Sequence, residues 1–139
     1  MSFFEKRRKK KAKHKADKTR ERAMPFFDDG MKDLYGNGNF FRSVDNFNRA
    51  VEIDESFFDA WLRLGLAHHK MENYDDAIRC FDKCISMNEE YQAHYNKGLA
   101  LFKKDEKKKA LASFKRSEKL MPGKHKKGGS IFGWIERCE

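Results

Sequence analysis

The sequence has little of what small catalytic or secreted domains usually contain. Its 139 residues include only three cysteines and two prolines, and no apolar run is long enough for a signal peptide or a membrane span. A glycine-rich phosphate loop, an HExxH motif and a CxxC pair are all missing. An odd number of cysteines without a secretory context indicates a reducing compartment. We therefore expect a protein that is not an enzyme, has no catalytic residues and no cofactor, does not insert into membranes, and resides in the cytoplasm or, alternatively, the nucleus.

Large and small side chains recur along the chain with a period of about 34 residues. Phe81 falls on Phe47 when counted back by 34 positions and on Phe114 when counted forward by 33, and Gly65 falls on Gly98 in the forward direction. A period of this length is typical of stacked structural repeats. Within residues 58–90 two stretches with helical apolar spacing flank a polar, turn-forming segment, so each unit is expected to form two antiparallel helices.

The middle unit carries a family resemblance. Residues at the characteristic spacing of the tetratricopeptide repeat are Trp61, Leu64, Gly65, Tyr74, Ala77 and Phe81. The chain thus resembles that family over about residues 24–124, which implies an all-α fold: a right-handed α-solenoid of three helix-turn-helix hairpins. The first unit departs from the pattern, with Met31 in place of the glycine, and the third has Lys97 and Lys107 where apolar and aromatic residues would stand.

Three segments are expected. Residues 1–22 form a basic N-terminal arm, either disordered or helical; residues 23–124 form the repeat domain, with repeats at about 24–57, 58–90 and 91–124; residues 125–139 form a linker and a short helix. The first helix of the first hairpin is predicted to begin at Pro25, and later helices at about 91–103 and 106–120.

The arm concentrates the positive charge of the protein. Eleven lysines and arginines against three acids give residues 1–22 a charge of +8, out of a total of +9. Candidates for contact with nucleic-acid phosphates are Lys6, Arg7, Arg8, Lys9, Lys10, Lys11, Lys13 and Lys15. A solvated extension, a nuclear address and contact with an anionic membrane surface are the alternatives.

The C-terminal segment predicts a short amphipathic helix, because Ile131, Trp134, Ile135 and Cys138 follow helical spacing. One interpretation is that this helix folds back over the end of the third repeat. The other is that Trp134 docks into another protein or into a second copy of the chain.

The resemblance also implies a concave groove lined by the first helix of each hairpin, which would bind a peptide or helix of a protein partner. The predicted groove residues are Asp28, Lys32, Tyr35, Asp59, Leu62, Arg63, Leu66, His69, Lys70, Tyr95, Asn96, Leu99, Phe102 and Lys103. A branch of the family clamps the C-terminal carboxylate of heat-shock chaperones with Lys, Asn and Arg. The corresponding positions here hold Asp28, Lys32, Arg63, Gln92 and Asn96, and we predict that this chain is not such a clamp.

Cys80 and Cys84 lie four residues apart on a predicted helix, and His68 and His69 lie on the helix that pairs with it. This spacing superficially suggests a metal site. Cys84 occupies a small-residue core position, however, and the family fold would direct His69 toward the groove. We therefore expect buried, reduced thiols and no metal.

Overall fold

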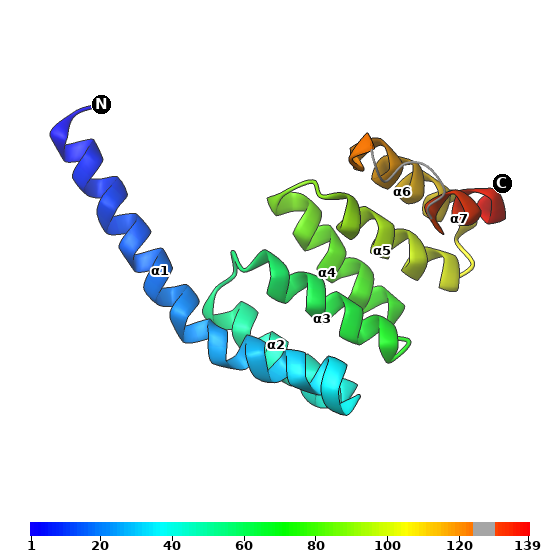
Figure 1. The fold of residues 1–139 in the computed structure, drawn as a ribbon, viewed down its shortest axis with the longest axis horizontal. Coiled ribbons are helices and arrows are strands. Elements are labelled where there is room, and N and C mark those ends of the chain that lie inside the picture. Colours follow the sequence, from blue (N-terminus) through cyan, green and yellow to red (C-terminus); the bar gives the residue numbers. More distant parts are fainter. Residues whose placement is uncertain (124–129) are drawn as a thin grey trace. The chain divides into compact units, whose positions relative to one another are not determined.

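A computed structural model describes residues 1–123 and 130–139 of the chain, and every regular element among them is helical (Figure 1). The helices are α1 (Phe3–Met31), α2 (Phe40–Ile53), α3 (Phe58–Lys70), α4 (Tyr74–Met87), α5 (Tyr91–Lys103), α6 (Lys107–Leu120) and α7 (Ser130–Cys138), with a wider π-type helix, η1 (Lys32–Asn37), after α1. The predicted linker at 125–129 lies outside the described residues. The chain divides into a first unit, Met1–Ala60, and a second unit, Trp61–Glu139.

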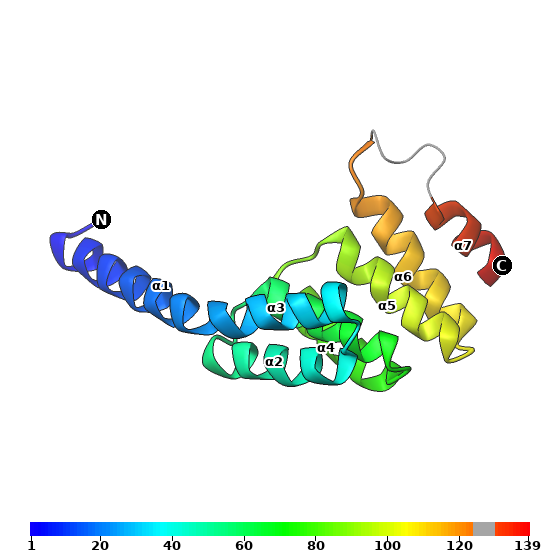
Figure 2. The same ribbon diagram turned by 60° about the horizontal axis from the view of Figure 1, so that its bottom comes forward.

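In the first unit, α1 is much longer than predicted and runs past the end of its partner α2 (Figure 2). The prediction that this helix begins at Pro25 was wrong. The helix begins at Phe3, where Ser2 and Glu5 cap each other: the Glu5 N–H donates to Ser2 Oγ at 3.2 Å and the Ser2 N–H donates to Glu5 Oε2 at 2.8 Å. The structure thus has the basic residues of the arm within α1.

Pro25 lies inside α1 without ending it. Proline removes one backbone hydrogen bond and costs roughly 3 kcal/mol in a helix interior. Contacts on both sides of Pro25 offset this cost: Ala23 is fully buried, and the Phe27 ring lies 4.8 Å from the Phe57 ring and 5.8 Å from the Phe47 ring. Tertiary packing thus keeps Pro25 inside the helix, although proline is locally unfavourable in a helix interior.

Each hairpin is closed by a glycine on its first helix and a phenylalanine on its second. A Cβ atom added to Gly65 would lie 2.5 Å from Phe81, and one added to Gly98 would lie 2.6 Å from Phe114. In the first hairpin the equivalent glycine is Gly30, at 2.7 Å from Phe47. The assignment of Met31 to this position was wrong by one residue.

The π-type turn η1 explains this shift, because it accommodates one extra residue between the glycine and the second helix. Asp33 holds the turn: its buried carboxylate accepts hydrogen bonds from Asn37 Nδ2 at 3.2 Å and Asn46 Nδ2 at 3.0 Å. Gly38 then adopts a left-handed φ of 63° and ends the turn. The core spacing of the hairpin is kept despite the extra residue.

The second helices carry the same buried pattern of small, aromatic, small side chains. Phe47, Phe81 and Phe114 are fully buried, as predicted. The small residues beside them are equally buried: Ser43 and Ala50 in α2, Ala77 and Cys84 in α4, and Ala110 and Ser117 in α6. Three equivalent hairpin cores therefore account for the sequence period.

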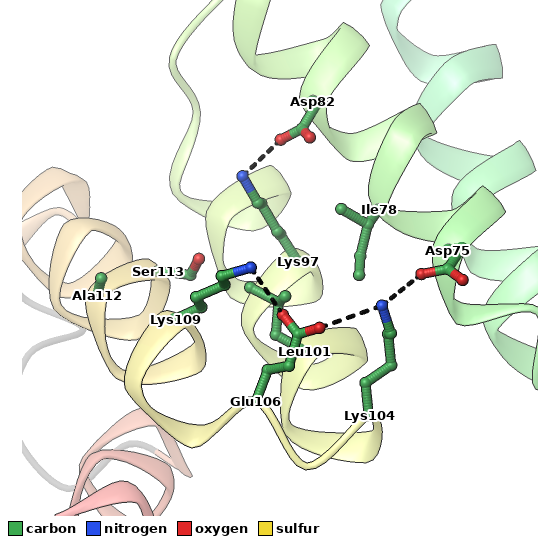
Figure 3. Close-up of a pocket in the computed structure, with 10 residues that line it drawn as sticks. All are labelled: Asp75, Ile78, Asp82, Lys97, Leu101, Lys104, Glu106, Lys109, Ala112 and Ser113. Atoms are coloured by element: carbon green, nitrogen blue, oxygen red, sulfur yellow. Dashed lines mark hydrogen bonds and ion pairs between the residues drawn. The ribbon is translucent and has the colours of Figure 1, made fainter.

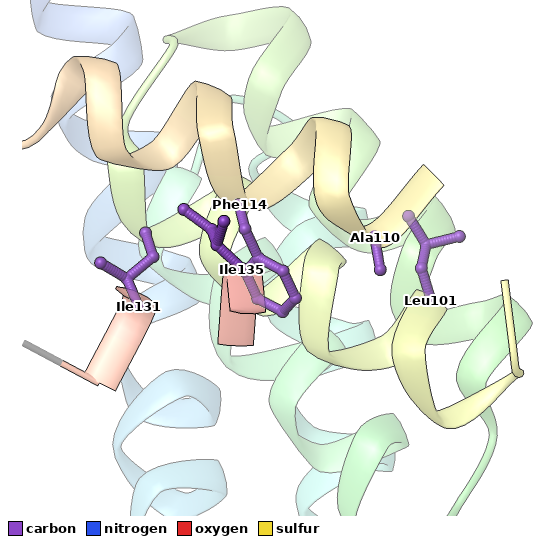
Figure 4. Packing of buried hydrophobic residues seen from close by; sticks show 5 residues of the cluster. All are labelled: Leu101, Ala110, Phe114, Ile131 and Ile135. Carbon is purple, nitrogen blue, oxygen red and sulfur yellow. The ribbon is translucent and has the colours of Figure 1, made fainter. Parts of the chain in front are cut away.

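Helix α7 packs onto the third hairpin (Figure 4). Ile131 and Ile135 are buried in one cluster with Leu101, Ala110 and Phe114. The interpretation that this helix folds back over the third repeat is confirmed. The alternative, docking of Trp134 into another protein or a second copy, is disfavoured, because the Trp134 ring already lies against Phe102 and Phe114 of its own chain.

Candidate partner-binding site

The C-terminal ends of α3 and α5 bring cationic groups together in the second unit. His69 is half-buried and packs its ring edge-on against Tyr74, with centroids 5.2 Å apart. Burial lowers the pKa of His69, and the nearby charges of Lys70 and Lys103 lower it further. The imidazole is therefore neutral at pH 7, and the exposed Lys70 and Lys103 supply positive charge that suits an acidic side chain of a ligand.

The N-terminal half of α5 borders a cleft of about 330 Å³ that both polar and apolar side chains line. Its lining includes the amides of Gln92 and Asn96 and the hydroxyl of Tyr91, together with Ser130 of α7. Tyr95 Oη and Ser130 Oγ share a hydrogen bond at 3.4 Å. These polar groups can donate and accept hydrogen bonds, and Met121 and Ile131 add apolar surface. None of the described lining residues carries a charge, so this cleft suits an uncharged segment of a peptide.

Helix α7 covers the apolar part of the predicted groove in the third repeat. Tyr95, Leu99 and Phe102 all pack against the cluster that contains α7, and the Phe102 ring lies 5.1 Å from Trp134. These three predicted groove residues are therefore partly buried against α7, which leaves less of their surface to a ligand. The side chain of Leu62 is also buried, with 6% exposure, so it offers little surface to a ligand.

The remaining predicted positions of the second unit stay at least partly accessible: Arg63, Leu66, His69, Lys70, Asn96 and Lys103. This set, with Gln92 beside it, forms the candidate site. We call it the α3–α5 face.

In the first unit Asp28, Lys32 and Tyr35 are exposed, as is Asp59 at the start of α3. The one-residue shift at Gly30 changes which positions of the second repeat these residues correspond to. Lys32 now corresponds to Ala67 and not to Leu66. Lys32 instead pairs with Asp29 at 3.7 Å. The positions equivalent to Leu62 and Leu66 become Phe27 and Met31, which carry no charge.

A second cleft, of about 520 Å³, lies among α4, α5 and α6 (Figure 3). The sequence signal for it was Lys97, which replaces the apolar Leu64 of the preceding repeat. Lys97 pairs with Asp82 at 2.6 Å, and Glu106 accepts from both Lys104 and Lys109 at 3.2 Å. Three lysines and three acids, Asp75 included, balance one another, so this cleft does not favour a charged ligand.

The two cysteines of α4 are free thiols in the core. Cys80 and Cys84 are buried with 5% and 0% exposure, and burial raises the pKa of Cys80 to about 12. The Cys80 thiol is therefore protonated and unreactive at pH 7. Among residues 1–123 and 130–139, no group of three or more His, Cys, Asp or Glu side chains is placed to hold a metal ion.

The arm presents its cations to solvent. All eight predicted nucleic-acid contacts, from Lys6 to Lys15, are exposed on α1. Arg7, Lys10, Lys11 and His14 line one shallow hollow on its surface. Within the described part of the chain, no helix is both long and apolar enough to span a bilayer.

Comparison with known proteins agrees with these hairpins. Models of the tetratricopeptide repeat match residues 58–91 and residues 91–123. The chain is a tetratricopeptide repeat protein. The first hairpin, with the same glycine–phenylalanine contact, completes about three repeats. No curated protein matches the sequence.

Solved structures of two tetratricopeptide repeat domains and of a type III secretion chaperone share this fold at low sequence identity. The Arabidopsis OM64 domain is 15% identical with a TM-score of 0.79, covering 87% of this chain and 97% of its own. The second domain of human RPAP3, in complex with an HSP70 peptide, is 16% identical with a TM-score of 0.78, covering 86% and 97%. SycD from Yersinia enterocolitica, in complex with a peptide of the translocator YopD, is 17% identical with a TM-score of 0.76, covering 85% and 92%.

Proposed function

We propose that this tetratricopeptide repeat protein is a non-enzymatic adaptor that binds a peptide or helix of a partner protein on the α3–α5 face. The observation that carries the proposal is that the two ends of this face differ in chemistry: one end presents uncharged amides and the other presents cations. Uncharged amides at Gln92 and Asn96 lie at one end of α5, and the cations Lys70 and Lys103 lie at the other ends of α3 and α5. A segment with an acidic residue following a polar stretch would match both.

The two solved complexes support this proposal, because both RPAP3 and SycD are described with bound peptides. A carboxylate clamp is a poor match for the present chain. The corrected register places Phe27 and Met31 at two of the positions that would need Lys and Asn, and Gln92 and Asn96 replace two cations. We expect only millimolar or weaker affinity for the HSP70 peptide SGPTIEEVD; micromolar binding that Arg63→Ala abolishes would contradict this expectation.

A peptide-display selection on the intact protein tests the adaptor function. Selected peptides should lose about tenfold or more in affinity with Asn96→Ala or Lys103→Glu, which corresponds to about 1.4 kcal/mol. Lys108→Glu is the matched control, since Lys108 is equally exposed but lies on α6. Peptides that bind both variants as tightly as the control would place their site elsewhere and refute the proposal.

A second candidate function is an RNA- or DNA-associated factor that contacts phosphates through the arm. The eight exposed cations on one helix favour it. Deletion of residues 1–18 should abolish nucleic-acid binding while Arg20 keeps its contacts with Asp54 and Phe57. Unchanged binding by the shortened protein would exclude the arm as the contact. For location we propose the cytoplasm, with the nucleus as the alternative.

A further inference from the structure

The arm is held in a fixed direction relative to the first hairpin. Arg20 Nε donates to the buried Asp54 Oδ2 at 2.6 Å, and Arg20 Nη2 donates to the carbonyl of Ser56 at 3.4 Å. The same guanidinium lies 4.0 Å from the centre of the Phe57 ring. Since α1 continues unbroken from Phe3 through Arg20, the basic residues form a helix that projects from this anchor.

The cations cover three sides of that helix. Counting about 100° per residue, Ala12 and Ala16 lie on the same side as Ala23, which is buried in the first hairpin. The opposite side holds the hollow formed by Arg7, Lys10, Lys11 and His14. On the two flanks lie Lys9 and Lys13 on one and Arg8 and Lys15 on the other. The single strip without a cation, which also holds Glu5 near the tip, thus lies in line with the hairpin's packing face, and residues 1–18 are exposed on every side of the helix.

This arrangement suits a groove better than a flat surface. A flat polyanion would meet one side of the helix, whereas a groove has two phosphate walls and a floor. A helix with its side chains is about 10–12 Å across, and the major groove of B-form DNA is about 12 Å wide. The major groove of A-form RNA is too narrow to admit side chains in this way.

We therefore propose that the arm lies as a helix in the major groove of double-stranded DNA, with its flanks on the phosphates and the cation-free strip facing out. This rests on the second function proposed above, since it requires that the arm bind nucleic acid. Lysine predominates over arginine along the stretch, so the contacts are mainly with phosphates and do not select a sequence.

An anionic membrane is a weaker match. Met1, Phe3 and Phe4 are exposed at the tip of the arm, with 71%, 72% and 71% exposure. Beyond them, residues 6–15 contain Ala12 and no larger apolar side chain, so this stretch has no apolar face to bury in a lipid interface.

The test uses the full chain and fluorescence anisotropy with four probes: a short DNA duplex, an RNA duplex of the same sequence, single-stranded DNA, and phosphatidylserine vesicles. We expect the DNA duplex to bind at least about tenfold more tightly than the RNA duplex. Affinity should fall with salt with a log–log slope of about −0.9 per phosphate contacted. Equal or tighter binding to the RNA duplex, single-stranded DNA or vesicles would overturn the proposal that the arm binds in the DNA major groove.

Charge reversal separates a groove from a flat surface. Lys13→Glu and Lys15→Glu lie on opposite flanks, and each should weaken binding to the DNA duplex by about tenfold or more, because both walls carry phosphates. Lys108→Glu on α6, with the same change in charge, should leave the affinity unchanged. Circular dichroism must show that both arm variants remain helical. Loss in only one of them would indicate a one-sided contact and overturn the proposal.

Dimethyl sulfate footprinting of the wild-type complex reports on the groove directly, because guanine N7 lies in the major groove. Protection of N7 is expected. Binding without protection would overturn the proposal of major-groove binding but not that of nucleic-acid binding by the arm. No binding to any nucleic acid would refute the second proposed function itself.

Discussion

Replacing Gly98 by alanine should destabilise the second unit, although alanine normally stabilises a helix. The new Cβ would lie 2.6 Å from the ring of Phe114, closer than any ordinary van der Waals contact. Phe114 is fully buried, and Trp134 stacks on it at a centroid distance of 6.0 Å, so neighbouring side chains oppose a movement of the ring. The two helices must separate or the ring must leave its rotamer.

The magnitude follows from two opposing terms. Overpacking of a core costs about 1–3 kcal/mol, while exchanging glycine for alanine inside a helix stabilises by about 1 kcal/mol. Gly133→Ala is the matched control, because Gly133 also lies within a helix, α7, and a Cβ there meets nothing within 4 Å. Subtracting the two variants removes the propensity term, so Gly98→Ala should be less stable than Gly133→Ala by about 1–3 kcal/mol.

Urea unfolding followed by circular dichroism measures this difference, provided that both variants unfold with the same slope. The double variant Gly98→Ala/Phe114→Leu adds a second measurement. Its loss of stability should be smaller than the sum of the two single losses, because the smaller side chain relieves the clash. If Gly98→Ala is as stabilising as Gly133→Ala, the close contact between α5 and α6 does not exist.

Three further outcomes are expected. Burial alone would raise the pKa of Asp54, but hydrogen bonds from Ser56 and Arg20 outweigh it and lower that pKa. The ionised carboxylate therefore stabilises the fold above the unfolded pKa of about 4, and this stability is lost as the pH falls through the folded pKa. Arg20→Ala should cost about 1 kcal/mol at pH 7, and its difference from wild type should shrink on acidification in urea titrations at successive pH values. Ile131→Ala, at a position with 2% exposure, should cost about 2–4 kcal/mol in calorimetry; a neutral result would mean that α7 is not docked. In native protein iodoacetamide should modify the half-exposed Cys138 before the buried Cys80, and mass spectrometry showing the reverse order would contradict the assigned core.

The hairpins of the second unit could be predicted closely because their signals are local. Helix α5 spans Tyr91–Lys103, as predicted from the sequence. The recurring phenylalanines identified the core because each one needs a small partner on the other helix. These features depend only on spacing within one repeat.

The errors arose where long-range packing decided the outcome. Proline is favoured in the first turn of a helix and disfavoured in its interior, so Pro25 predicted a helix start. The contacts of Phe27 with Phe47 and Phe57, which support the helix around Pro25, are distant in sequence. The extra residue in η1 was invisible to a fixed period, so Met31 was assigned the place of Gly30. Likewise, nothing within the third repeat indicates that Phe102 contacts Trp134.

The unbroken course of α1 has a consequence for how strongly the arm can hold a ligand. A flexible arm would lose about 1–2 kcal/mol of backbone entropy for each residue that becomes ordered upon binding. Residues Phe3–Met31 already form one helix, so the backbone entropy is lost during folding and not upon binding. The electrostatic attraction of the cations therefore need not offset that loss when the ligand binds. Pre-organisation, more than the number of charges, would then set the lifetime of a complex formed through the arm.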